Sequence, residues 1–354
     1  MSPVIRRALL TVHQWVGLAA GLFLVVISIS GSALVFENEI DRALNWSTAF
    51  VAPGAQPLPI ETLIARVKAA YPSDEVTGVA IAARPDLAYE LSLRSRQGAM
   101  VNPYTGDILG LRNHEKSFAR WVHLVHTRFD ADKIGEAMVG WFSVAMLGLS
   151  ITGLVLWWPR KILTVGSASS WKRTNFDLHN VLGFYSSLVM LCITLSGVLI
   201  AFENVTDPLV RRLNPPAADT AAPQSTPVAG GRRISVDRAI AIGEAALPGA
   251  AASNVGLPAG PKAVFRILKK FPEDRTPAGR SRVYVDQFSG KVLLVENTRT
   301  APLGTRILNL KRSAHTGDIF GAPTQALYFI VSLGIALQAI TGALIWVNSR
   351  KRAR

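Results

Sequence analysis

Four stretches without a charged residue limit what this chain can fold into. They cover residues 15–36, 137–158, 180–202 and 322–347. A helix needs about 20 apolar residues to cross a hydrocarbon core about 30 Å thick, and each stretch reaches that length. Because lipid offers no hydrogen bonds to the backbone, such stretches cross a bilayer as helices. The sequence therefore predicts a mainly α membrane protein with a four-helix transmembrane bundle in contact with the lipid bilayer.

The polar residues around these stretches occur twice. One set recurs after 166 residues: His13, Gly17, Ser30, Gly31, Phe36, Glu37, Asn38 and Asp41 return as His179, Gly183, Ser196, Gly197, Phe202, Glu203, Asn204 and Asp207. A second set recurs after 189 residues: His126, Thr127, Thr152, Gly153 and Trp157 return as His315, Thr316, Thr341, Gly342 and Trp346. The pattern predicts two tandem repeats, each made of histidine, helix, polar module, histidine and helix.

Basic residues in the short flanks predict the topology, because such residues tend to remain in the cytoplasm. They are Arg6, Arg7, Arg160, Lys161, Lys172, Arg173, Arg350, Lys351, Arg352 and Arg354. We expect a multi-pass protein of a bacterial inner membrane, with a retained first helix and both termini cytoplasmic. The segments 41–125 and 207–314 are then periplasmic. The net charge of +14 partly reflects this anchoring, and no nucleic-acid motif accompanies it.

The expected domain organisation follows from these boundaries. It runs as cytoplasmic head and first transmembrane helix (1–40), first extramembrane module (41–113), interfacial helix with a ligand histidine (114–136), second transmembrane helix (137–160), cytoplasmic loop (161–177), third transmembrane helix (178–206), linker (207–231), second module (232–300), second ligand segment (301–321), and fourth transmembrane helix with the cytoplasmic tail (322–354).

Both modules read as small α+β units. Residues 60–71 and 236–247 have helical apolar spacing, and Ser235 is a plausible N-cap of the second helix. Short apolar runs at 76–82, 88–93 and 99–101 are typical of strands. Each module closes with a hairpin whose turn ends in glycine, at Gly106 and Gly290.

Four histidines occupy repeat-equivalent positions. The topology places His13 and His179 at the cytoplasmic end of the bundle and His126 and His315 toward the other face. Two imidazoles from separate helices are what axial ligation of a b-type haem requires. Nearby small residues offer space for a flat macrocycle: Gly17, Gly21, Ser30, Gly31, Thr152, Gly153, Gly183, Ser196, Gly197, Thr341 and Gly342. The sequence predicts two non-covalent, bis-histidine haem b groups, one per pair.

Other interpretations compete with haem. Histidines at helix ends also contact headgroups, and small residues also serve helix packing. Structural zinc usually takes four protein ligands, and no carboxylate or thiol lies at helical spacing from His13 or His179. His123 is an alternate ligand to His126, whereas His114 reads as a solvated loop residue. The single cysteine, Cys192, reads as a packing residue and excludes an intrachain disulfide or a cysteine-ligated cluster.

Several motifs resemble those of the PepSY-associated transmembrane helix family, also called iron-regulated membrane proteins. They are His13-Gln-Trp-Val-Gly17 with Ser30-Gly31, Leu124-Val-His126-x-x-Phe129, Thr152-Gly153-Leu-Val-Leu-Trp-Trp158-Pro-Arg, His179-Asn-Val-Leu-Gly183 and His315-Thr-Gly-Asp-Ile-Phe-Gly321. The resemblance spans nearly the whole chain. It implies that the two modules are PepSY-like and that the protein is a haem-dependent oxidoreductase for iron uptake, which reduces ferric siderophore in the periplasm.

The resemblance leaves the electron donor and the siderophore open. No Gly-rich dinucleotide fingerprint occurs, so we expect a separate donor, either a quinol or a cytoplasmic reductase. Basic residues such as Arg94, Arg96, Lys269 and Lys270 either attract anionic chelates or form an ordinary solvated surface. The alternative function is a non-enzymatic membrane regulator that binds peptide or restrains a periplasmic protease. A metal transporter ranks last, because the helix centres lack polar groups.

Overall fold

The computed structural model describes residues 1–159, 161–166, 170–213, 222–228 and 230–350. Four of the basic residues used for the topology prediction, Arg160, Lys351, Arg352 and Arg354, lie outside them, as does much of the predicted linker. The chain forms two compact units. The first consists of residues 1–37, 121–209 and 310–354, and the second of residues 38–120 and 210–309.

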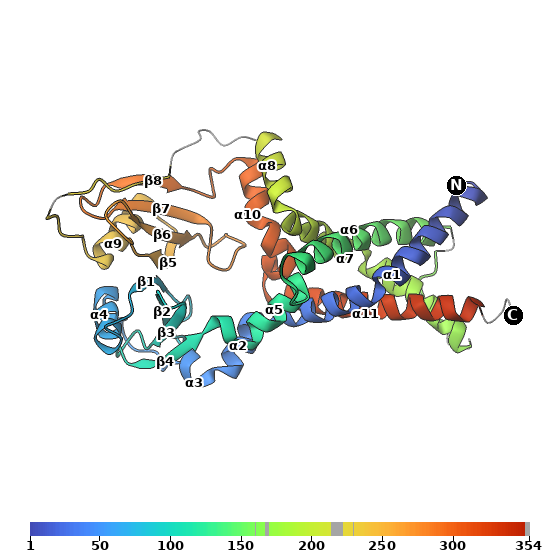
Figure 1. The fold of residues 1–354 in the computed structure, drawn as a ribbon, viewed down its shortest axis with the longest axis horizontal. Coiled ribbons are helices and arrows are strands. Elements are labelled where there is room, and N and C mark those ends of the chain that lie inside the picture. The colour runs from blue at the N-terminus through green and yellow to red at the C-terminus, as the bar shows by residue number, and fades with distance from the viewer. Residues whose placement is uncertain (160, 167–169, 214–221, 229, 351–354) are drawn as a thin grey trace. The chain divides into compact units, whose positions relative to one another are not determined.

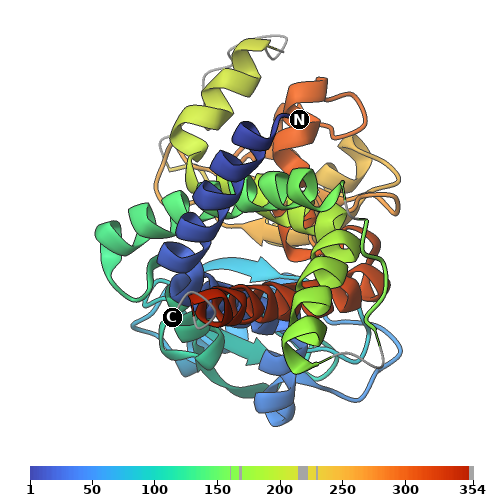
Figure 2. The ribbon, with the colours of Figure 1, turned by 90° about the vertical axis from the view of Figure 1, so that its right-hand side faces the viewer.

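Four long helices build the first unit: α1 (Pro3–Val35), α6 (Asp132–Trp157), α7 (Trp171–Ala201) and α11 (Ala322–Arg350). Each is long and apolar enough to cross a membrane. Helix α1 packs against α6 and α11, and α7 packs against the same two helices, so that α1 and α7 occupy opposite corners of the bundle. Helix α1 begins and α11 ends at the same end of the bundle (Figures 1 and 2).

The middle of the bundle is apolar and comes from paired positions of the sequence. Leu24 and Met190 are separated by 166 residues, Met146 and Ile335 by 189, and all four are buried in one cluster. Large tryptophans, in contrast, lie exposed near the helix ends, among them Trp15, Trp141, Trp158 and Trp171. Apolar helices with exposed tryptophans at their ends are typical of membrane-spanning segments.

Short helices continue two of the long ones. After α1 come α2 (Glu37–Leu44) and α3 (Trp46–Ala49), and after α7 comes α8 (Glu203–Leu213). Helices α5 (Phe118–Arg128) and α10 (Leu303–Thr316) precede α6 and α11, with short 3₁₀ turns η1 (His114–Lys116) before α5 and η2 (Asp318–Phe320) after α10.

Several predicted boundaries were wrong. The third long helix begins at Trp171, inside the predicted cytoplasmic loop 161–177, and the second begins at Asp132, inside the predicted interfacial segment 114–136. The predicted linker 207–231 starts too early, because residues 207–213 belong to α8. Lys311 binds the Glu203 and Asp207 carboxylates, at 3.0 and 2.8 Å, and so attaches α8 to α10. Ion pairs between distant segments leave no trace in local spacing.

The second unit is built on one antiparallel sheet of eight strands, in the order β4-β3-β2-β1-β5-β6-β7-β8. The strands are β1 (Val76–Ala80), β2 (Tyr89–Leu93), β3 (Gln97–Val101), β4 (Ile108–Asn113), β5 (Ala251–Gly256), β6 (Val264–Lys270), β7 (Ser281–Asp286) and β8 (Val292–Glu296). The two modules are joined where β1 pairs with β5, with Val79 opposite Val255. The predicted helices and strands are present, but two separate modules are not.

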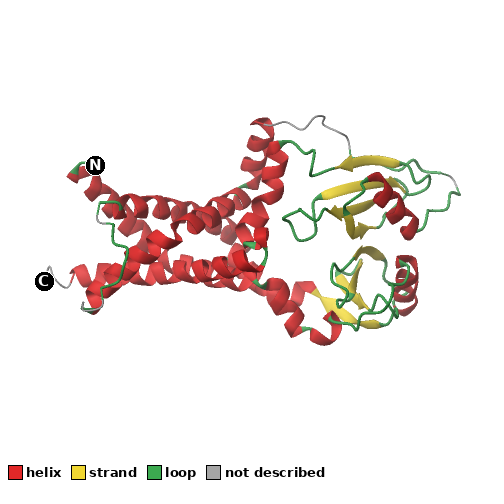
Figure 3. Ribbon diagram, turned by 180° about the vertical axis from the view of Figure 1, so that it is seen from behind, coloured by secondary structure: helices red, strands yellow, loops and turns green. Residues whose placement is uncertain are grey.

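Helices α4 (Ile60–Ala70) and α9 (Val236–Ala246) cover the sheet with one shared core (Figure 3). Fully buried aliphatic residues of both helices and strands, such as Leu63, Val79, Val255 and Ile267, form that core. The two hairpin turns place Gly106 and Gly290 at φ of 75° and 72°, in the left-handed region that glycine adopts without strain.

The N-termini of α4 and α9 cap each other. The Asp237 carboxylate accepts hydrogen bonds from the backbone N–H groups of Ile60 and Glu61, at 2.8 and 3.0 Å. The Glu61 carboxylate accepts one from the N–H of Val236 at 2.8 Å. The first N–H groups of a helix have no partner within the helix, and a negative charge there is favourable. The exchange of caps therefore ties the two halves of the sheet together.

We expect Asp237→Ala to destabilise the second unit by about 1 kcal/mol, the usual cost of losing an N-cap. Hydrogen–deuterium exchange of the full chain should show faster exchange in the first turn of α4. Asp237→Asn keeps one acceptor oxygen and should have a smaller effect. Equal exchange rates in the wild type and Asp237→Ala would contradict this role.

Candidate functional site

Two pairs of histidines stand out in the first unit. His13 in α1 and His179 in α7 form the first pair, and His126 in α5 and His315 in α10 form the second. All four side chains are partly buried. Along α1, His13 and the contact point of His126 at Ile27 are 14 residues apart, which corresponds to about 21 Å of helix.

Each histidine of the first pair is held by a threonine on a neighbouring helix. His13 Nδ1 lies 2.8 Å from the Thr152 hydroxyl of α6, and His179 Nδ1 lies 2.9 Å from the Thr341 hydroxyl of α11. Both threonines already donate their hydroxyl hydrogen to a backbone carbonyl one turn earlier. The hydroxyl oxygen therefore accepts from the imidazole, and Nδ1 carries the hydrogen.

The second pair is held by backbone carbonyls. His126 Nδ1 donates to the Ile27 carbonyl oxygen of α1 at 2.9 Å, and His315 Nδ1 donates to the Ile193 carbonyl oxygen of α7 at 3.0 Å. The hydroxyls of Ser30 and Ser196 each lie 3.3 Å from the same nitrogens. Because a carbonyl only accepts, Nδ1 is again the protonated nitrogen. In all four histidines the lone pair is on Nε2, the state that binds a metal.

The two rings of the second pair lie face to face across a short gap. Their centroids are 6.1 Å apart, with the planes inclined by 44°. Two metal–imidazole bonds of about 2 Å, together with the two half-rings, span about 6 Å. The separation therefore suits one metal ion held between both imidazoles. In the first pair, His179 interacts electrostatically with His13.

Four glycines make room for the imidazole rings. A Cβ at Gly31 would lie 2.8 Å from Cε1 of His126, and one at Gly197 would lie 3.1 Å from Cε1 of His315. A Cβ at Gly153 or Gly342 would lie 3.4 or 3.3 Å from the ring of His13 or His179. The sequence interpretation assigned these glycines to a macrocycle, whereas they contact the ligand rings. Gly17, Gly21 and Gly183 instead face neighbouring helices.

The repeated dipeptides therefore have a common function. Ser30-Gly31 and Ser196-Gly197 receive the second histidine pair, and Thr152-Gly153 and Thr341-Gly342 receive the first. In every case the hydroxyl lies beside Nδ1, and the glycine lets the ring approach the helix backbone. Sequence reasoning missed the hydroxyls as hydrogen-bond partners. The signal was present, because each dipeptide recurs at the same shift as a histidine.

The second pair is neutral at physiological pH. Burial, reinforced by the nearby His315, lowers the pKa of His126 to about 4. Burial also lowers the pKa of His315. A neutral imidazole is the form that coordinates a metal.

An ion-pair network supports the helix that carries His315. Lys311 lies one turn before His315 in α10 and binds Glu203 and Asp207 of α8. Burial alone would lower the pKa of Lys311, but its hydrogen bonds to Asp207 and Glu203 outweigh this and raise it. Lys311 is 14% exposed, so this pair contributes more to holding α10 than an exposed one would.

The other candidate residues have different surroundings. His123 lies one turn before His126 on α5, and the geometry leaves it as the alternate ligand. His114 is not a solvated loop residue, because its Nε2 donates to the Glu90 carboxylate at 2.6 Å in η1. Cys192 is exposed on α7 rather than buried as predicted.

The basic residues proposed as an anion-attracting surface do not form one. Lys269 is fully buried, where its ammonium donates to the carbonyls of Gly243 and Leu247 at the end of α9 and pairs with Glu244. Arg94 forms an ion pair with Glu75. Only Arg96 and Lys270 keep the role that the sequence suggested as a possibility. Alternation along β6 places Lys269 on the core side of the sheet, which composition alone does not reveal.

Within the described ranges, no group of three or more His, Cys, Asp or Glu side chains gathers at a distance suited to a metal ion. Each histidine pair therefore offers two nitrogen ligands and no further protein ligand. Structural zinc usually takes four. A planar cofactor that fills the remaining positions of its metal needs only two axial ligands.

Comparison with protein families gives a single result. Residues 10–349 match the family model of the PepSY-associated TM region. The chain belongs to this family. A comparison with curated proteins finds no match. In this PepSY-associated protein the matched region contains all four histidines, all four hydroxyl-glycine dipeptides and the whole eight-stranded sheet.

We expect Gly31→Ala to displace the imidazole of His126, because the added Cβ would overlap its ring. Nitrogen NMR of histidine-labelled protein should show His126 losing its Nδ1–H hydrogen bond to Ile27, with the other histidines unchanged. Gly148→Ala is the matched control, since its Cβ meets no described atom within 4 Å. Identical histidine spectra for Gly31→Ala and the wild type would contradict the contact.

Proposed function

We propose that this protein holds two b-type haems and carries electrons across the bacterial inner membrane to reduce ferric siderophore in the periplasm. The haems are bound by His13 with His179 and by His126 with His315. The observation that carries the proposal is the common state of the four imidazoles. Each donates its Nδ1–H to a neighbouring helix and leaves Nε2 for a metal, in pairs.

The residues fit haem on three independent grounds. The 6.1 Å ring separation of the second pair suits one metal between two imidazoles. The protein supplies two ligands per site, as bis-histidine haem requires. Outer hydrogen bonds to the ligand histidines fix their orientation and raise their basicity. When bound, bis-histidine haem supplies one-electron transfer without an open position for oxygen chemistry.

The chain's own residues account for the path between the sites. Two histidine levels about 21 Å apart divide the thickness of a bilayer, and the buried layer of Leu24, Met146, Met190 and Ile335 separates them. This layer excludes water from the middle of the bundle. The arrangement supports electron passage and argues against an ion pathway, which needs polar groups at mid-membrane.

The topology and the duplication are part of the proposal. Basic residues near Arg6, Lys172 and Arg350 favour a cytoplasmic position for both ends of the chain and for the loop before α7. This orientation puts the first histidine pair near the cytoplasm, the second near the periplasm, and the PepSY-like sheet outside the membrane. Equivalent hydrogen bonds at equivalent positions support descent from two tandem repeats. The electron donor is a separate quinol or cytoplasmic reductase.

Haem stoichiometry tests the ligand assignment. A pyridine haemochrome assay should give two haems per wild-type chain and one in His13→Ala, because Nε2 of one axial position is lost. His315→Ala should lose the other haem, and the double variant both. His114→Ala is the control and should keep two. Two haems surviving in the His13→Ala, His315→Ala double variant would refute the assignment, and haem loss in His123→Ala rather than His126→Ala would move the ligand to His123.

Reductase activity needs a separate measurement. Dithionite-reduced protein mixed with ferric siderophore under argon should reoxidise, with Fe(II) captured by ferrozine in proportion to the haem oxidised. The same reaction should fail in the double histidine variant. Protein with full haem content that ignores every ferric chelate would leave the haem sites standing and refute the reductase function. Function that survives in the double variant would favour the regulator alternative.

A further inference from the structure

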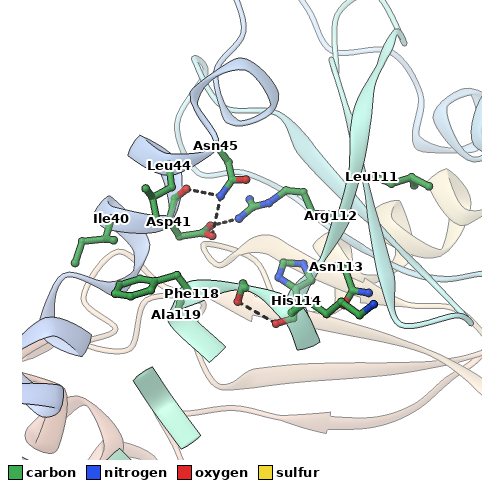
Figure 4. Close-up of a pocket in the computed structure, with 12 residues that line it drawn as sticks. Ile40, Asp41, Leu44, Asn45, Leu111, Arg112, Asn113, His114, Phe118 and Ala119 are labelled. Carbon is green, nitrogen blue, oxygen red and sulfur yellow. Dashed lines mark hydrogen bonds and ion pairs between the residues drawn. The ribbon is translucent and has the colours of Figure 1, made fainter. Parts of the chain in front are cut away.

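The second unit contains a pocket that lies apart from the histidine pairs. It has a volume of about 340 Å³ and is lined by α2, the end of β4, η1 and the start of α5. Figure 4 shows its polar side chains on one wall. The lining residues are Ile40, Asp41, Leu44, Asn45, Leu111, Arg112, Asn113, His114, Lys116, Ser117, Phe118 and Ala119.

One wall of the pocket is held rigid by a charge cluster. Arg112 forms an ion pair with Asp41, and the side chain of Asn45 donates to the same Asp41 carboxylate at 3.2 Å. The Arg112 side chain is 11% exposed and that of Asp41 23%. Only one Arg112 nitrogen is used by Asp41, so the fork of the guanidinium has further donors for a ligand.

The rest of the polar wall is also cationic. Lys116 lines the pocket, and no ion pair to it occurs among the described residues. His114 donates from Nε2 to Glu90, and this hydrogen bond raises the pKa of His114, although burial and Arg112 oppose it. Asp41 is the one acidic residue in the lining. The wall therefore presents more positive than negative charge.

The rim of the pocket is apolar and open. Leu44, Leu111 and Phe118 are 65%, 41% and 52% exposed. A cationic wall beside an apolar rim suits an organic body that carries oxyanions. A bare inorganic anion would use only the wall.

Chain connectivity links this pocket to the second histidine pair. Phe118 is the first residue of α5, and His126 lies eight residues further on the same helix, which is about 12 Å of helix. Helix α2, which supplies Ile40 and Leu44, begins one residue after α1 ends. Two walls of the pocket are thus continuations of the helices that hold His126.

The pocket is specific to the first half of the sequence. The residues 189 positions after Arg112 to Lys116 are Ala301, Pro302, Leu303, Gly304 and Thr305, which carry no charge. Asp207, the counterpart of Asp41, pairs instead with Lys311 of α10. The scaffold folds in the second half without an Arg112 equivalent, so the cationic wall is not required by the scaffold.

We propose that this pocket binds the anionic, oxygen-rich edge of the ferric chelate, with Lys116 and Arg112 contacting carboxylate oxygens and the apolar rim contacting the ligand body. The inference rests on the proposed reductase function for the identity of the ligand. A lipid phosphate offers similar chemistry, and the experiment separates the two sources.

Binding is tested with gallium(III) citrate, which resembles the ferric complex in charge but is not reduced. Titration calorimetry on the full chain in phosphatidylcholine nanodiscs should show binding that Lys116→Glu weakens by about tenfold, through reversal of an attractive charge. Lys116→Arg should keep the affinity. Lys68→Glu makes the same change on the exposed side of α4 and should behave as the wild type. The cationic gallium(III) complex of desferrioxamine B should not lose affinity in Lys116→Glu.

Three results would overturn the proposal. They are unchanged gallium citrate affinity in Lys116→Glu, an equal loss in Lys68→Glu, and loss of wild-type binding when the nanodiscs contain phosphatidylglycerol, which would assign the pocket to a lipid headgroup. Because gallium is not reduced, failure here is distinct from failure of the reductase function, which the haem and ferrozine assays measure.

Discussion

The structure depends on one interaction made four times, the hydrogen bond from a histidine Nδ1–H to an adjacent helix. A polar ring buried in an apolar bundle is costly unless it finds a partner. The helices offer only two kinds of acceptor, a backbone carbonyl and a hydroxyl that already donates to its own helix. His126 uses the first kind at Ile27, and His13 uses the second at Thr152. Both solutions leave Nε2 unprotonated.

These hydrogen bonds also explain how the helices are arranged. The first pair joins α1 to α6 and α7 to α11, whereas the second pair joins α5 to α1 and α10 to α7. Helices α1 and α7 therefore take part at both histidine levels. The small residues follow from this, because a ring reaches a helix backbone only where no Cβ intervenes, as at Gly31 and Gly197. Ring orientation and helix packing are set by the same contacts.

Much of this could be predicted from the sequence, because repeats and uncharged stretches are local signals. The four long helices, the hairpins at Gly106 and Gly290 and the family followed from them. Features that depend on contacts between distant segments did not. The joining of β1 to β5, the mutual caps of Glu61 and Asp237, and the burial of Lys269 each require knowledge of which segments meet. The partner of a histidine hydrogen bond belongs to the same class, although the repeated hydroxyl-glycine dipeptides pointed to it.

The departures from the repeat carry different information from the repeat itself. Positions shared by both halves, such as the four histidines and their glycines, build two equivalent sites and cannot distinguish one side of the bundle from the other. A site for a single substrate molecule must break that equivalence. Asp41 and Asp207 are such a point, since one pairs with Arg112 from a strand and the other with Lys311 from a helix. The first choice leaves a cationic wall beside α5, whereas the second uses its charge to hold α10. Selection for an asymmetric substrate would act on this difference, and it could do so without disturbing the symmetric ligands.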